Sequence, residues 1–378
     1  MLRARFFGMN LRIISLAVFC FSSIAAALPV VDLSGEVERQ VVVEPGTPEI
    51  YQGHPTTVLL PDGRSLFAVW TLGHGGPCGP MKRSDDGGRT WSPLLPVPED
   101  WKTVRNCPAI YQLADPQGKT RLIVFAGQGP GGSRQPDNGM MHQSFSEDGG
   151  KTWSPMKPNG LECVMPFCTI SPVEGGKKLI GLTNIRRPGD TEDRYSNILT
   201  QSESTDGGLT WSPWRVILDL DPLRVCEPEV IRSPDGRQLL CLYRENRKRE
   251  AGFMTSDDEG KTWSSPRRLP QALVGDRHKA RYAPDGSLVI CFRDKSSAFG
   301  TMNHFVAWVG RYEDIPHEGR GIRVKLLHSH AGGDCGYPGL ELLPDGTFVA
   351  TTYIKYRPGP EKHSIISTRF RLDDLEKR

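Results

Sequence analysis

The sequence contains hardly any stretch in which apolar residues recur every three to four positions, which argues against a mainly helical fold. Its 47 Lys and Arg residues are spread through the chain and leave a formal net charge of only +3, so a nucleic-acid partner is not implied. No two of its 9 cysteines are spaced as Cys-x-x-Cys, and no loop carries the alternating acidic residues and closing Glu of a calcium site. We therefore expect neither a bound metal nor a cofactor.

Long apolar runs are equally scarce. The one prominent run, residues 13–21, is too short and wrongly flanked to span a membrane. Three arginines precede it and three alanines (residues 25–27) follow it, which is the arrangement of a secretory signal peptide. We expect a signal peptide over residues 1–27, a secreted or periplasmic protein with no membrane span, and a single domain over residues 28–378.

Eight cysteines follow the expected cleavage point, and an oxidising compartment permits disulfides between them. Cys241 and Cys291 lie inside apolar, strand-like runs and are expected to be core thiols. Conceivable bridges join Cys163 to Cys168 and Cys78 to Cys107, and the sequence does not choose between them.

Repeats are abundant. The pattern Ser-x-Asp-x-Gly-x-Thr-Trp, which we call the Asp box, starts at Ser84, Ser146, Ser204 and Ser256. Ser and Asp side chains can bond backbone N–H groups two residues on, and Gly supplies backbone angles that other residues reach only with strain. Thr and Trp then return to a strand, where the Trp ring can pack between neighbouring units. The box is thus predicted to be a structural turn.

A second repeat combines a short strand opening, a Pro-Asp-Gly turn or its equivalent, and an apolar strand. Its six copies open at His54, Cys107, Cys168, Glu227, His278 and Tyr337. Six units of four strands predict an all-β fold, a six-bladed β-propeller with Asp-box turns, in which residues 41–43 complete the final blade. Because the first strand of each blade lines the centre, we expect these side chains to meet there: His54, residues 105–107, Glu227, His278 and Tyr337.

The boxes and these strand openings resemble the non-viral sialidases, the Asp-box glycoside hydrolases, over essentially the whole chain after residue 27. The resemblance implies release of terminal sialic acid, or of a related 2-keto sugar acid, from glycans. Glu227 in Cys226-Glu227-Pro228-Glu229-Val230 and Tyr337 in Gly336-Tyr337-Pro338-Gly339-Leu340 match the family's Glu and nucleophilic Tyr. Pro338 stands where the family usually has Ser.

The remaining site residues are carried over by the same resemblance. Asp137 stands about where the family has its acid, and Arg105, Arg244 and Arg293 match its three arginines. Arg105 has one extra residue before its proline, and an additional blade precedes it. His54 and His278 are possible pocket residues, although a structural role is the simpler interpretation, and Asp276 and Asp334 are alternative carboxylates to Asp137.

These residue types suit an acidic sugar. Three guanidinium groups can clamp the substrate carboxylate through bidentate bonds. A neutral Tyr nucleophile avoids the repulsion that a carboxylate nucleophile would meet, and Glu227 can accept its proton. Asp137 would protonate the leaving oxygen and later activate water, with net retention. The expected partners are sialylated or other acidic-sugar glycans, bound by a monomer; the alternative is a non-catalytic propeller that only binds carbohydrate or protein.

Overall fold

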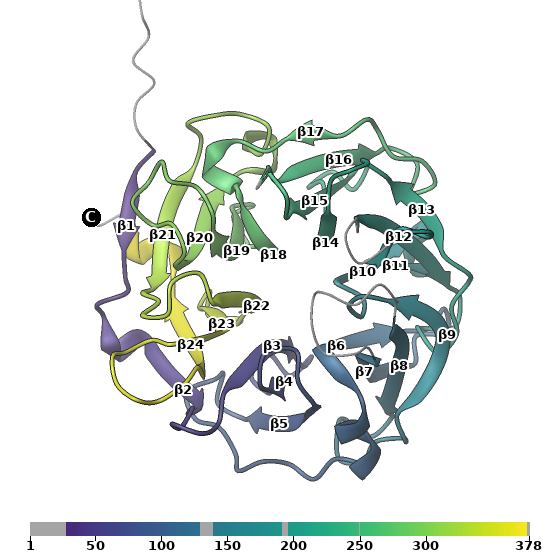
Figure 1. Cartoon of the computed structure of the whole chain (residues 1–378), viewed down its shortest axis with the longest axis horizontal. Helices are drawn as coiled ribbons and strands as arrows, with labels where there is room; N and C mark the ends of the chain where they lie inside the picture. Colours follow the sequence, from purple (N-terminus) through teal and green to yellow (C-terminus); the bar gives the residue numbers. More distant parts are fainter. Residues whose placement is uncertain (1–27, 129–138, 191–195, 249, 376–378) are drawn as a thin grey trace, which may run out of the picture.

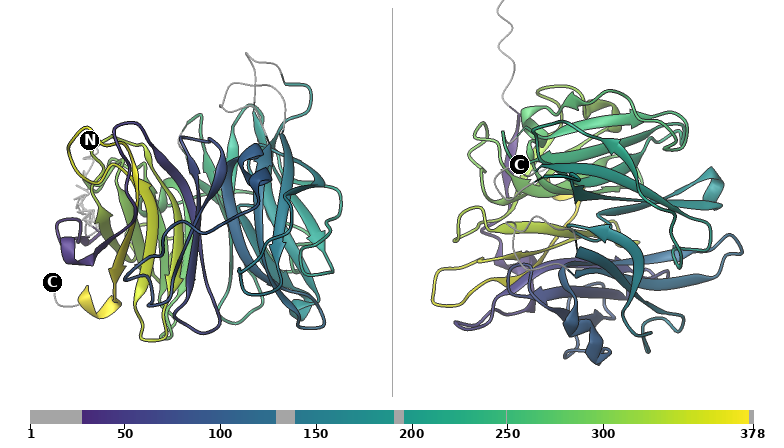
Figure 2. Two further views of the ribbon diagram at one scale, coloured as in Figure 1. Left: turned by 90° about the horizontal axis from the view of Figure 1, so that it is seen from below. Right: turned by 45° about the vertical axis from the view of Figure 1, so that its right-hand side comes forward.

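The strands form six sheets set around one central axis, and this confirms the predicted six-bladed β-propeller (Figure 1). The computed structural model describes residues 28–128, 139–190, 196–248 and 250–375. The predicted signal peptide therefore lies outside the described residues. Turns and loops gather at the two ends of the ring, while the strands run between them (Figure 2).

The sheets are numbered as blades in chain order. Blade 1 contains β3 (Gln52–Leu59), β4 (Leu66–Leu72) and β5 (Cys78–Ser84). Blade 2 contains β6 (Arg105–Ala114), β7 (Thr120–Gln128), β8 (Gly139–Ser146) and β9 (Lys157–Cys163). Blade 3 contains β10 (Thr169–Val173), β11 (Lys178–Arg186), β12 (Asn197–Ser204) and β13 (Arg215–Leu218).

Blade 4 contains β14 (Val225–Arg232), β15 (Leu239–Glu245), β16 (Gly252–Ser256) and β17 (Arg267–Arg268). Blade 5 contains β18 (Gly275–Tyr282), β19 (Leu288–Asp294), β20 (Phe305–Gly310), β21 (Ile322–Leu327) and β1 (Val30–Asp32). Blade 6 contains β22 (Cys335–Leu342), β23 (Phe348–Ile354), β24 (Ser364–Phe370) and β2 (Gln40–Glu44). The described helices are short 3-10 turns: η1 (Val37–Arg39), η2 (Glu99–Thr103), η3 (Glu174–Gly176), η4 (Gln271–Leu273), η5 (Tyr312–Asp314) and η6 (Leu372–Asp374).

The ring is closed by a strand from the beginning of the described chain. β2 pairs antiparallel with β24, with Val41 opposite Ser367, so residues 41–43 complete the final blade as predicted. β1 adds a further strand, parallel to β21, to blade 5. Both pairings tie the N-terminal part of the described chain to its C-terminal blades.

Blade 1 departs from the predicted four strands, because only three are formed. The segment after its Asp box contains Pro93, Pro96 and Pro98, and proline has no N–H group to donate to a sheet ladder. Leu95 still donates its N–H to the Met81 carbonyl at 2.9 Å. The segment after the Asp box therefore runs along the outer strand β5 but does not form a fourth strand.

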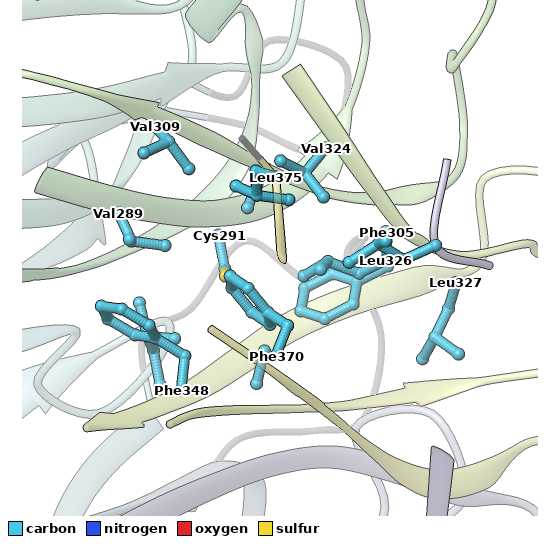
Figure 3. Packing of buried hydrophobic residues seen from close by; sticks show 14 of the residues in the cluster. Val289, Cys291, Phe305, Val309, Val324, Leu326, Leu327, Phe348, Phe370 and Leu375 are labelled. Carbon is cyan, nitrogen blue, oxygen red and sulfur yellow. The ribbon is translucent and has the colours of Figure 1, made fainter. Parts of the chain in front are cut away.

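The core is divided among the interfaces between neighbouring blades. Between blades 5 and 6, Phe305 and Phe348 are fully buried together with aliphatic residues from both sheets (Figure 3). Truncating one such aromatic side chain to Ala typically costs about 3–5 kcal/mol. Each blade thus buries a face of its neighbour. The apolar packing between blades holds the innermost strands in place around the axis.

The four Asp boxes are structural turns, as predicted. In the first, Asp86 accepts hydrogen bonds from the backbone N–H groups of Arg89 and Thr90, both at 2.9 Å, and from the Thr90 hydroxyl at 2.6 Å. Ser84 Oγ donates to Asp86 and accepts from the Gly88 N–H, each at 2.8 Å. The boxes at Asp148, Asp206 and Asp258 repeat the bonds to Ser and Thr.

The eight cysteines of the described chain are buried free thiols. Cys241 and Cys291 are fully buried core residues, as predicted. The conceivable bridges between Cys163 and Cys168 and between Cys78 and Cys107 are not formed. The described residues contain no helix with the length and apolarity needed to cross a membrane.

Candidate active site

Five of the six innermost strands carry an interruption at the same place. The register of pairing shifts after the second residue in β3, β14, β18 and β22 and after the first in β6, which is the mark of a β-bulge. The third residue of each has a positive φ: His54, Cys107, Glu227, Arg277 and Tyr337. Such a backbone conformation is strained for residues other than glycine, and it turns a side chain out of the strand's normal alternation.

These bulges bring the predicted Tyr and Glu together from blades that are 110 residues apart in sequence. The Tyr337 hydroxyl donates a hydrogen bond of 2.5 Å to Glu227 Oε1. Arg244 Nη1 donates to the same oxygen at 2.6 Å. The Glu227 backbone N–H is itself held by Asn184 Oδ1 of β11, at 3.3 Å.

The environment keeps the phenol of Tyr337 neutral. Burial, and then the negative charge of Glu227, raise the pKa of Tyr337 well above that of a free phenol. Ionisation of this hydroxyl therefore requires that its proton be transferred directly, and Glu227 is the acceptor in contact.

Asp276 binds two of the predicted arginines. Its Oδ1 lies 2.8 Å from Arg244 Nε, and its Oδ2 lies 2.7 Å from Arg293 Nη2. Burial alone would raise the pKa of Asp276, but the guanidinium groups of Arg244 and Arg293 outweigh it, so the pKa is lowered and the carboxylate stays ionised. Arg293 Nη1 also donates to the carbonyls of Gly333 and Cys335, which leaves this guanidinium largely occupied.

A fourth guanidinium, that of Arg277, was not foreseen. Arg277 is 6% exposed, donates to the Cys168 thiol at 2.7 Å, and lies 5.4 Å from the centre of the Tyr337 ring. It forms no ion pair with any carboxylate of the described residues. A buried cation without a counter-ion is costly unless a ligand supplies the negative charge.

Beside Tyr337 lies a second group of polar side chains, which we call the Asp334 cluster: Tyr51, His54, His74, Asp334, Tyr353 and His363. Tyr51 and Tyr353 donate their hydroxyls to Asp334 at 3.0 and 3.3 Å. The rings of His74 and His54 are in contact, and His54 in turn contacts Tyr337, with centroids 4.5 and 4.6 Å apart. Asp334, an alternative carboxylate in the sequence analysis, thus stands near Tyr337.

Other predicted residues are placed elsewhere. Arg105 begins β6 with an exposed side chain and, among the described residues, joins none of the contacts around Tyr337. His278 lies behind Arg277, where its Nε2 is 2.9 Å from the Leu273 carbonyl and its ring packs on Phe292, so its role is structural. Asp137 lies outside the described residues.

Arg277 and Tyr353 could have been found by counting along the strands. Arg277 holds the same third position in β18 that Glu227 holds in β14. In β14 a proline follows that position, whereas β18 has His278 there. Tyr353 is the sixth residue of β23, as Arg244 and Arg293 are of β15 and β19. The position of each residue within its strand therefore identifies Arg277 and Tyr353, whereas the proline that follows Glu227 has no counterpart after Arg277.

Comparisons with known proteins agree with this class of fold, a β-propeller with Asp-box turns. The family model described as "BNR repeat-like domain" matches residues 81–348. The chain belongs to this BNR repeat-like family. No curated protein matches it.

Solved structures with the same architecture include several glycosidases. An α-L-arabinanase of Penicillium chrysogenum, complexed with arabinobiose, has a TM-score of 0.64 and 17% identity, over 89% of this chain and 98% of that one. An intramolecular trans-sialidase of Ruminococcus gnavus has a TM-score of 0.55 and 13% identity, over 86% and 95%. A Dyadobacter fermentans protein of unknown function has a TM-score of 0.68 and 15% identity, over 87% and 97%. At these identities the likeness shows the fold alone, a β-propeller.

Proposed function

We propose that the protein is an exo-acting glycoside hydrolase that releases a terminal sialic acid, or a related 2-keto sugar acid, from glycans with retention. The observation that carries this proposal is the 2.5 Å hydrogen bond from the Tyr337 hydroxyl to Glu227. A phenol paired with a carboxylate within hydrogen-bond distance is the arrangement of an activated nucleophile and its base. Tyr337 is partly exposed, so a substrate can reach it.

The reaction uses this pair in two steps. Tyr337 Oη attacks the anomeric carbon while its proton moves to Glu227, and the bond to the leaving oxygen breaks as an acid protonates that oxygen. Water then attacks the same carbon and gives a proton to the conjugate base of that acid, the bond to Tyr337 breaks, and Glu227 returns its proton to the phenolate. Two displacements at one carbon restore its configuration, which gives retention.

The charges around the pair favour an anionic substrate. Two carboxylates, Glu227 and Asp276, are surrounded by three guanidinium groups and by Lys295, which lies 3.6 Å from Asp276. Arg277 lacks a carboxylate partner among the described residues and is therefore our first candidate for the substrate carboxylate. Arg244 is the second, and the occupied Arg293 supports Asp276 and the backbone of blade 6.

The cellular setting follows from the sequence. The signal peptide expected over residues 1–27 would direct the protein to a secreted or periplasmic location, where glycans ending in acidic sugars are accessible. We propose that it works there as a monomer on such glycans.

A fluorogenic sialoside assay tests the proposal. Tyr337→Phe and Glu227→Gln should each reduce kcat by about 10²–10⁴-fold, because the nucleophile or its base is lost. Matched controls are Tyr282→Phe, whose hydroxyl bonds the Arg232 carbonyl, and Glu229→Gln, which changes the same residue type two positions along β14; the folded controls should keep wild-type kcat.

Stereochemistry and substrate range complete the test. NMR of the first-formed sugar should show retention of the anomeric configuration. A folded wild-type protein that binds glycans without cleaving any sialoside would instead be a binding propeller. Cleavage of neutral arabinosides alone would contradict the acidic substrate.

A further inference from the structure

The proposed reaction needs a group that protonates the leaving oxygen, and the carboxylates near Tyr337 in the described part of the chain are unsuited to that task. Glu227 is committed to Tyr337 and Arg244. Asp276 is held between Arg244, Arg293 and Lys295. Asp334 accepts hydrogen bonds from two phenols and contacts two imidazoles. Burial raises the pKa of Asp334, but the contacts with His74 and His363 outweigh burial and lower it to about 2.

His74 is a titratable group of the Asp334 cluster with a side chain open to solvent. It lies in the loop between β4 and β5, its side chain is 61% exposed, and its Nδ1 is 3.3 Å from Asp334 Oδ1. Among the described residues nothing binds its Nε2. Its ring stands against His54, which contacts Tyr337.

The loop that carries His74 is fixed at both sides of it. Gly73 donates its N–H to the Tyr51 carbonyl at 2.7 Å, and Gly75 donates its N–H to His54 Nδ1 at 3.1 Å. His54 therefore holds this loop by its Nδ1 and the Tyr337 ring by its face. Burial, and then the neighbouring His74, lower the pKa of His54 well below its usual value, so His54 stays neutral and acts as a spacer.

We propose that His74 is the general acid and base of the reaction, with Asp334 as its positioning residue. An imidazole whose Nδ1–H is held by a carboxylate has its other nitrogen oriented for proton transfer. This inference rests on the proposed glycoside hydrolase function and adds the residue that its chemistry requires.

The proton balance is complete with these groups. In the first step, His74 Nε2–H gives its proton to the glycosidic oxygen as the bond from that oxygen to the anomeric carbon breaks and the alcohol leaves. In the second step, neutral His74 takes a proton from the attacking water as the bond to Tyr337 breaks. The imidazolium is restored, and no oxidant, reductant or metal takes part.

His74 must carry a proton on its Nε2 at the start of the reaction. The groups that face it are Asp334 and Tyr51, which contact it directly, and His54, with His363 and Tyr353 on the far side of Asp334. The Asp334 carboxylate orients the imidazole. Asp334→Asn should therefore lower kcat/KM for a substrate whose leaving group needs a proton more than for one whose leaving group does not.

The experiment compares two leaving groups in wild-type protein, His74→Gln, Asp137→Asn and Asp334→Asn. Sialyllactose has an alcohol leaving group that needs protonation, and 4-methylumbelliferyl sialoside has a phenolic one that needs little. His74→Gln should lower kcat/KM about 10²–10⁴-fold for sialyllactose, and less than about tenfold for the aryl sialoside. His317→Gln, an exposed histidine beyond η5, is the matched control and should change neither.

Each other outcome has a distinct meaning. Equal losses on the two substrates in His74→Gln would show that His74 is not the proton donor, while the proposed function would stand. A selective loss on sialyllactose in Asp137→Asn, with His74→Gln unchanged, would assign the proton transfer to Asp137 and overturn the inference. A folded wild-type protein that cleaves neither substrate would overturn the proposed function and this inference together.

Discussion

The acidic residues of the Asp boxes and those at the centre of the ring are held in opposite ways. Asp86 is satisfied by residues within four positions of it in the sequence. Glu227 and Asp276 are bound by side chains from other strands, and Glu227 by a phenol from another blade. The boxes thus fold from local information, whereas the central residues acquire partners only when the ring closes.

The backbone shows the same division. In the first three Asp boxes the positions with positive φ are glycines, such as Gly87 and Gly88, for which that conformation is not strained; the fourth box has Glu259 at one of them. In the bulges the positive φ falls on Glu227, Arg277 and Tyr337. Strain of this kind costs on the order of 1–3 kcal/mol per residue. It is therefore concentrated where side chains must turn toward the axis, and among the four boxes it falls only on Glu259.

The largest effect should follow from breaking the central network at Asp276. Asp276→Asn keeps the size of the side chain but leaves Arg244 and Arg293 without their shared counter-ion. Removing one partner of a buried ion pair costs about 3–5 kcal/mol, so the free energy of unfolding should fall by that amount, together with kcat. Urea unfolding and initial-rate kinetics would check both effects.

Glu229→Gln is the matched control for Asp276→Asn. Glu229 is also buried and pairs with a cation, Lys279 at 3.2 Å, but it does not contact the Tyr337–Glu227 pair. The control should lose stability and keep kcat. If Asp276→Asn behaved in the same way, the ion pairs at the centre would be structural only.

How much could be predicted from the sequence depends on the same distinction. The boxes, six hairpins and closing strand at residues 41–43 were predictable because each is encoded in a short contiguous pattern. Glu227 and Tyr337 were predicted because the strand openings that contain them resemble a known family. Arg244 was predicted because it lies near the end of the strand that follows Glu227. Arg105 joins none of the contacts around Tyr337 among the described residues, and Arg277 was not predicted. An inserted residue at the first and a missing proline at the second change the register of the bulge, and only the folded ring shows which residue then faces the axis.

A smaller and more selective effect is expected at Arg277. Arg277→Gln removes a buried cation that has no carboxylate partner among the described residues, so the free energy of unfolding should stay the same or rise. A charge-assisted hydrogen bond to the substrate carboxylate is worth about 1.5–3 kcal/mol, so KM for a sialoside should rise about 10- to 150-fold. Kinetics and thermal unfolding, with Arg281→Gln on the same strand as control, would check this. A large loss of stability with unchanged KM would make Arg277 a structural residue.

The smallest effect should come from the boxes, and it should depend on pH. The bonds from Thr90 and Ser84 outweigh partial burial and lower the pKa of Asp86 to about 2, from 3.8 in an unfolded chain. A carboxyl whose pKa is lowered on folding stabilises the protein above its unfolded pKa, and this contribution is lost as pH falls from about 4 to about 2.

Asp86→Asn should therefore lower the free energy of unfolding by about 1 kcal/mol at pH 7, given the exposure of the turn. It should also flatten the acid limb of stability against pH and leave kcat unchanged. Thermal unfolding from pH 7 to pH 2 would test this, because a change in kcat or an unaltered acid limb would show that this box is coupled to the centre of the ring and is more than a local turn.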